Sequence, residues 1–91
     1  MIRITVWPEA IRFEGHAGYA PAGRDIVCAA VSALYHTLVV NLQDRPGYVQ
    51  DGTELRCPGA AAQIAFVARG LEAIAAAYPE CVRVERGGEN L

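Results

Sequence analysis

Cys28 is the residue whose type and position most favour chemistry. It is the third residue of an apolar segment that follows Asp25, and Asp is a strong N-cap residue that accepts from the N–H of the third helical residue. If a helix begins at residue 26, its free N–H groups and its dipole favour negative charge at Cys28. The thiolate is the nucleophilic form of cysteine. Cys28 is therefore a candidate nucleophile, and the alternative is a small buried core residue.

A nucleophilic cysteine needs a base within hydrogen-bond reach, and the sequence offers two histidines. His36 lies two helical turns beyond Cys28, about 12 Å along the axis at 1.5 Å per residue. That is too far for direct proton transfer, so we interpret His36 as an ordinary helix or interface histidine. His16 precedes a glycine-rich loop that returns to Cys28, and the two ends of such a loop can lie side by side. His16 is the candidate general base.

The expected elements around these residues are two strands, a helix, two strands, a helix and a strand. Alternating apolar residues predict a hairpin of strands at 2–7 and 11–14 and a last strand at 82–85. Two short strands flank Asp51-Gly52, a dipeptide favoured in hairpin turns. Helices are expected over 26–43 and 60–78, with residues 15–23 as a mobile loop and the glycine-rich tail from Gly87 frayed. This order predicts a single α+β domain over residues 1–91, with two layers: an antiparallel or mixed sheet of about four to five strands covered by two helices.

Composition makes several classes of function improbable. The net charge is −2 and the 8 basic residues are scattered, whereas nucleic-acid binding needs a clustered basic face. The apolar stretch Ile26–Leu42 contains polar residues, while a membrane span needs roughly 20 mostly apolar ones; a helix buried on several sides is expected instead. No signal peptide is visible, so we expect a cytoplasmic protein with reduced thiols. We expect no nucleic-acid or membrane partner.

The other cysteines, Cys57 and Cys81, look structural. With Cys28 they make an odd number, which argues against a disulfide framework. The cysteines and histidines do not fall at zinc-ligand spacings, and there is no phosphate-binding or dinucleotide-binding glycine motif. We therefore expect neither a metal nor a cofactor.

Two stretches of the sequence resemble the ribosomal-processing cysteine protease family, called Prp. Residues 15–20 are GHAGYA and residues 23–34 are GRDIVCAAVSAL. The ending AAAYPE at residues 75–80 and the order of elements over essentially the whole chain also agree. The segment 58–62 departs from the family pattern, being shorter and less acidic, which leaves any substrate contact there open.

The resemblance implies a small homodimeric cysteine protease without a cofactor. Its substrate would be the N-terminal extension of the large-subunit ribosomal protein numbered twenty-seven, cut after a short apolar motif that contains Phe. The family's catalytic Cys and His fall on Cys28 and His16, and its supporting Asp and Ser fall on Asp25 and Ser32. A mobile loop that orders around substrate corresponds to Ala17 to Arg24, with Ala17, Gly18, Tyr19, Gly23 and Arg24 as the substrate-binding positions.

Several details of this mechanism stay open. Helix-start N–H groups near Cys28 are expected to stabilise the oxyanion. Asp25 is expected to cap the helix, to orient His16, or to do both. Ser32 either bonds within the site or bonds back to a carbonyl of its own helix.

Two other functions are alternatives. One is a non-enzymatic, dimeric, ribosome-associated module in which Cys28 is an inert core thiol. The other is a redox sensor, which needs Cys57 or Cys81 as a resolving thiol.

There is also a physical reason to expect dimerisation. The first helix is apolar nearly all round, and Phe66 lies outside the apolar stripe of the second helix, one turn before Gly70.

Overall fold

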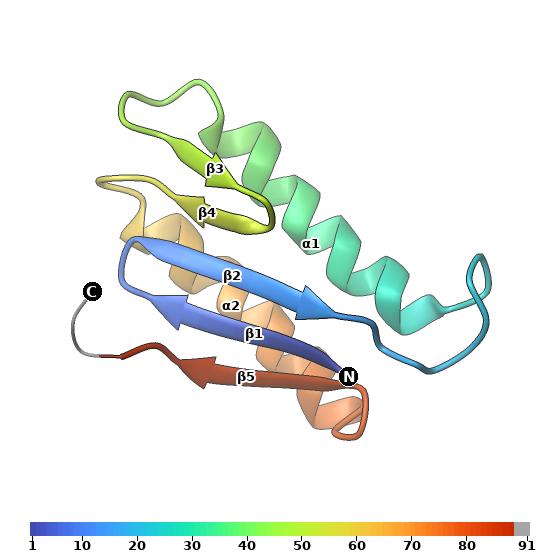
Figure 1. The fold of residues 1–91 in the computed structure, drawn as a ribbon. Helices are drawn as coiled ribbons and strands as arrows, with labels where there is room; N and C mark the ends of the chain where they lie inside the picture. The colour runs from blue at the N-terminus through green and yellow to red at the C-terminus, as the bar shows by residue number, and fades with distance from the viewer. Residues whose placement is uncertain (89–91) are drawn as a thin grey trace.

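Two layers make up the fold in the computed structural model, which describes residues 1–88: a five-stranded sheet and two helices that cover one of its faces (Figure 1). The elements in chain order are β1 (Ile2–Trp7), β2 (Ala10–Gly15), α1 (Ile26–Leu42), β3 (Val49–Asp51), β4 (Glu54–Arg56), α2 (Ala61–Ala77) and β5 (Val82–Arg86). The expected α+β class, the two covering helices and the mixed sheet are confirmed.

The sheet has the strand order β3-β4-β2-β1-β5. β1 and β2 form the expected hairpin, with Ile4 opposite Phe13. Gly52 turns the β3–β4 hairpin with φ of +60°, a conformation that glycine adopts without steric cost. β5 pairs with β1 in parallel. α2 connects β4, on the other side of β2, to β5 and so carries the chain across the sheet to this edge.

The core lies between the sheet and the helices. β1, β2 and β4 contribute Ile4, Ile11 and Leu55, which are fully buried. Ile64 and Leu71 of α2 meet them at the spacing of one helix face. Fully burying each such side chain contributes about 1.5–3 kcal/mol, so this shared core fixes α2 firmly on the sheet.

Three expectations about burial and pairing were wrong. The alternation over residues 2–7 places Trp7 on the strand face opposite Ile4 and Val6, which a half-buried strand exposes. Trp7 is nevertheless only 8% exposed, because Arg12 and the backbone of Gly87 cover its ring. Gly87 was expected to fray, but its N–H donates to the Val6 carbonyl at 2.9 Å; residues 89–91 of the same tail lie outside the described residues. α1 buries only one stripe in the single chain, since the sheet and α2 cover only part of it, and Val40 is 63% exposed.

One end of the molecule brings the candidate residues together. β2 ends at Gly15 and α1 begins at Ile26, and the loop between them arches beyond the sheet at the same end (Figure 1). Within residues 1–88, no helix is long and apolar enough to cross a membrane.

Candidate active site

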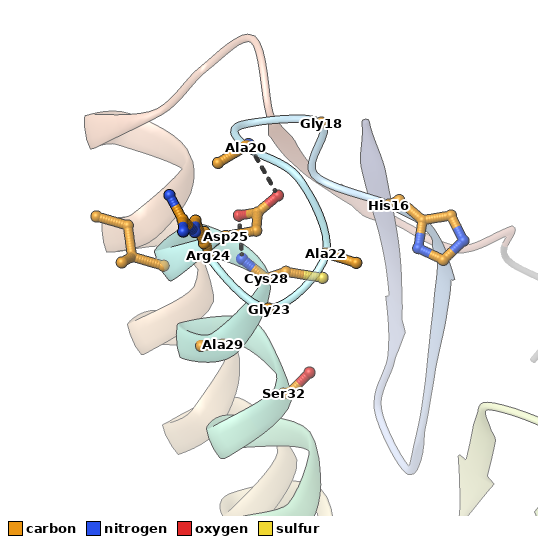
Figure 2. Close-up of a pocket in the computed structure, with 11 residues that line it drawn as sticks. His16, Gly18, Ala20, Ala22, Gly23, Arg24, Asp25, Cys28, Ala29 and Ser32 are labelled. Atoms are coloured by element: carbon orange, nitrogen blue, oxygen red, sulfur yellow. Dashed lines mark hydrogen bonds between the residues drawn. The ribbon is translucent and has the colours of Figure 1, made fainter.

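A cleft of about 720 Å³ opens where the end of β2, the loop and the start of α1 meet; we call it the loop cleft (Figure 2). His16 lines one side of it, and Asp25, Cys28 and Ser32 line the side formed by α1. The loop contributes Gly18, Ala20, Ala22, Gly23 and Arg24. The four residues singled out for catalysis and its support thus line one cleft.

Gly15 fixes where His16 leaves the sheet. Its φ is +90°, and a side chain at this position would collide with the Met1 carbonyl oxygen. Only glycine fits both demands, so the last residue of β2 can lie against the chain start and release His16 toward the cleft. His16 itself is exposed.

Asp25 joins the loop to the start of α1. Its Oδ1 accepts from the Cys28 N–H at 2.8 Å, which confirms the predicted N-cap. Its Oδ2 accepts from the N–H groups of Tyr19 at 3.1 Å and Ala20 at 3.4 Å. These backbone bonds, with that from Cys28 the strongest, hold the pKa of the Asp25 carboxyl below its usual value. All three side-chain bonds go to backbone N–H groups, so the structure favours capping over the orientation of His16.

The Cys28 thiol is half-buried and points to the side of the cleft on which His16 lies (Figure 2). No hydrogen bond joins the two side chains among those found for residues 1–88, and bonds of this kind often tighten only when substrate is bound. The Cys28 N–H is taken by Asp25, and the Ala29 N–H donates to the Asp25 carbonyl at 3.0 Å.

The Cys28 and Ala29 amides are therefore already bonded within the protein. The stabilisation of an oxyanion by helix-start N–H groups stays a prediction. Other donors remain among the residues that line the loop cleft. The Ser32 hydroxyl and the backbone amides of Ala22 and Gly23 have no partner within the described part of the chain. The loop therefore holds amides that are free to donate to a bound substrate.

A second cleft, of about 630 Å³, adjoins the first; we call it the sheet cleft. The two clefts share His16, Cys28 and Ser32, and the sheet cleft continues toward Phe13, Val31, Tyr35, His36 and Thr53. The Tyr35 ring packs edge-on against Phe13, with centroids 5.1 Å apart. Its hydroxyl accepts from Gln50 Nε2 at 2.9 Å, which ties this aromatic wall to the β3–β4 hairpin.

Ser32 and His36 have clear positions. Ser32 is exposed and its hydroxyl forms no hydrogen bond within residues 1–88, whereas the Thr37 hydroxyl on the same helix donates to the Ala33 carbonyl at 2.7 Å. Ser32 thus leaves its hydroxyl available to the clefts. His36 lines the sheet cleft beyond Tyr35, so it neighbours the site although it is two helical turns from Cys28.

The predicted substrate-binding positions divide into two groups. Gly18, Gly23 and Arg24 line the loop cleft. Ala17 is buried in the core, and the Tyr19 ring packs against Tyr78 at the end of α2. The sequence reasoning did not single out Ala22, which lines the cleft, or Tyr78; nothing in their local sequence distinguishes them, because their positions depend on how the loop folds back.

Cys57 is fully buried in the core and Cys81 is half-buried beside the start of β5. All three cysteines are free. Within residues 1–88, no three His, Cys, Asp or Glu side chains gather closely enough to hold a metal ion. Cys28, His16 and Ser32 bring a thiol, an imidazole and a hydroxyl to both clefts.

A thiol at a capped helix start that shares its clefts with a histidine is typical of a cysteine hydrolase. The model of the family described as cysteine protease Prp matches residues 1–83. The chain belongs to this family and is a cysteine protease.

Solved structures share the fold. The ribosomal processing protease Prp from Staphylococcus aureus, in complex with a covalently linked product peptide, is 24% identical, with a TM-score of 0.70 over 94% of this chain and 97% of that one. SMU.848 from Streptococcus mutans is also 24% identical, with a TM-score of 0.70 over 94% and 93%. The Staphylococcus aureus protease in complex with a substrate peptide is 23% identical, with a TM-score of 0.64 over 94% of this chain and 97% of that one. No curated protein sequence gives a significant match.

Proposed function

We propose that this protein is a cytoplasmic endopeptidase that removes the N-terminal extension of the large-subunit ribosomal protein numbered twenty-seven. The observation that carries the proposal is the meeting of Cys28 and His16 in both clefts of a Prp-family chain. The Staphylococcus aureus relative is a ribosomal processing protease, which supports the substrate class.

Cys28 acts as the nucleophile and His16 as its base. His16 takes the thiol proton, and the sulfur attacks the carbonyl carbon of the scissile peptide bond. The C–N bond then breaks as His16 gives the proton to the leaving amine, which leaves an acyl-thioester on Cys28. Water, deprotonated by His16, hydrolyses the thioester and restores the thiol. The Ser32 hydroxyl and the loop amides are the donors that stabilise the oxyanion.

The substrate lies across the two clefts with its scissile bond at Cys28. An extended peptide suits them because they adjoin on either side of the thiol. Val31, Phe13 and Tyr35 give the sheet cleft an apolar and aromatic wall, which suits the apolar, Phe-containing motif that precedes the cut. Glycines 18 and 23 let the peptide backbone approach the loop closely.

A homodimer is the second part of the proposal. Phe66 on α2 is 82% exposed, although Phe is among the residue types most often fully buried. It separates two hollows between α1 and α2, which we call the helix hollows; they are lined by Leu34, Thr37, Leu38, Asn41, Ala62, Gln63, Val67, Arg69 and Gly70. Two copies related by a two-fold axis can each insert Phe66 into a hollow of the other.

Thiol alkylation separates the protease from an inert module on the same fold. At neutral pH, iodoacetamide is expected to modify Cys28 far faster than the fully buried Cys57, and His16→Ala is expected to slow the reaction at Cys28. Peptide mass spectrometry identifies the modified cysteine. Equally slow labelling of Cys28 and Cys57 in the folded wild type would contradict the proposed nucleophile.

A further inference from the structure

A contact outside both clefts holds the loop that forms one of them. The Tyr19 ring packs edge-to-face on the Tyr78 ring, with centroids 5.5 Å apart and planes at 82°. Tyr19 is the one aromatic residue between His16 and Cys28. Its two neighbours, Gly18 and Ala20, line the loop cleft, whereas Tyr19 is not among the lining residues. The loop thus presents mostly backbone and small residues to the cleft, together with Arg24, and packs its one aromatic side chain against Tyr78 at the end of α2.

Tyr78 is a firm support for that contact. Its N–H donates to the Ile74 carbonyl at 2.8 Å, and its own carbonyl accepts from Cys81 at 2.9 Å and Val82 at 3.1 Å. Its side chain packs against the buried core. The corner between α2 and β5 is therefore anchored on both sides, while most of the loop is exposed.

The contact is linked to the reacting groups through Asp25. The Tyr19 N–H donates to Asp25 Oδ2, and Asp25 Oδ1 accepts from the Cys28 N–H. Tyr19 is thus held at its backbone by the residue that caps the nucleophile's helix and at its ring by Tyr78. The same loop carries the amides of Ala22 and Gly23, which have no partner within the described residues and are free to meet an oxyanion. The Cys28 and Ala29 amides, by contrast, are already bonded.

We propose that Tyr78 is a positioning residue for the protease: through Tyr19 it holds the loop in the conformation that lines the cleft and presents its amides to the substrate. The kinetic consequence rests on the proposed function, whereas the structural consequence does not. Loss of either ring removes this tether and leaves the loop held by the Asp25 hydrogen bonds and the buried Ala17, so the conformation that lines the cleft becomes less populated.

Hydrogen exchange tests the structural part without any substrate. The Tyr19 and Ala20 amides are the probes, because both donate to Asp25. Tyr78→Ala is expected to speed their exchange by about 2- to 12-fold, the range that an aromatic pair supplies. Tyr78→Phe keeps the ring and is expected to exchange as the wild type does. Amides of the β1–β2 hairpin serve as the internal control, since a general loss of stability would speed them too.

Kinetics on a peptide that spans the extension junction test the functional part. Tyr78→Ala and Tyr19→Ala are each expected to lower kcat by about 2- to 12-fold, with Tyr78→Phe restoring it. Because both act through one contact, the double variant should lose no more than the worse single variant. Unchanged loop exchange in Tyr78→Ala, or losses in kcat that multiply in the double variant, would overturn the positioning role. If the wild type does not cleave the peptide, the proposed function is refuted. The hydrogen-exchange rates of the Tyr19 and Ala20 amides then decide alone whether Tyr78 holds the loop.

Discussion

Phe66→Ala tests the proposed homodimer, because the exposure of Phe66 gives an estimate of how much its burial would stabilise the dimer. Fully burying a Phe side chain contributes about 1.5–3 kcal/mol, and 82% of Phe66 is exposed in the single chain. Burial in a partner's helix hollow would therefore contribute about 1.2–2.5 kcal/mol. A two-fold interface buries two such rings, so the variant should lose about 2.5–5 kcal/mol of association free energy, which weakens the dimer by about two to four orders of magnitude.

Analytical ultracentrifugation over a range of concentrations measures this dissociation constant. Wild type should sediment as a dimer at micromolar concentration, and Phe66→Ala should approach the 9.8 kDa monomer. Val49→Ala is a matched control, because Val49 is 54% exposed on β3 and lines neither helix hollow. A 9.8 kDa species alone in the wild type, or equal dissociation constants for Phe66→Ala and wild type, would refute the reasoning.

Three further predictions follow from the site and the core. Gly15→Ala should cost about 1–3 kcal/mol of stability and lower kcat, because φ is +90° and the Met1 carbonyl blocks a side chain. Gly52→Ala is the control and should leave kcat unchanged, because Gly52 has a φ of +60° but open space around it. Equal kcat values for the two variants would show that Gly15 does not place His16. Ile64→Ala should lower the free energy of unfolding in urea by about 2–5 kcal/mol, since Ile64 is fully buried; a loss below 1 kcal/mol would mean that α2 packs differently. The pKa of Asp25 is lowered in the folded state. The ionised carboxylate therefore stabilises the fold above the unfolded pKa of about 3.9, and this stabilisation is lost as pH falls through the lower folded pKa. Urea midpoints measured from pH 6 to pH 2 should show this loss in wild type and less of it in Asp25→Asn, and identical profiles would contradict the assignment.

Local sequence patterns predicted the elements because each rests on short-range chemistry. Asp25 before an apolar run predicted the N-cap, and the structure has it at 2.8 Å from the Cys28 N–H. Asp51-Gly52 predicted the turn between β3 and β4. The common location of His16 and Cys28 followed from a short loop that joins a strand end to a helix start.

What the sequence did not predict depends on distant parts of the chain. The parallel pairing of β1 with β5, and the cover over Trp7, arise only when the last strand joins the sheet edge. The Ala22 and Gly23 amides have no partner within the described residues and lie beside the loop cleft because of how the loop folds back, which the order of residues along the chain does not reveal. Tyr78 is far from the site in sequence and reaches it only through the folded loop.

Mass spectrometry of a peptide that spans the extension junction of the ribosomal protein tests the central claim most directly. The peptide is incubated with wild-type protein, with Cys28→Ala and with Cys57→Ala as a cysteine control. A single cut by wild type and Cys57→Ala, and none by Cys28→Ala, is the predicted result. Cleavage that persists in Cys28→Ala, or no cleavage by folded wild type, would contradict the assignment of Cys28 as the nucleophile of a ribosomal-protein protease.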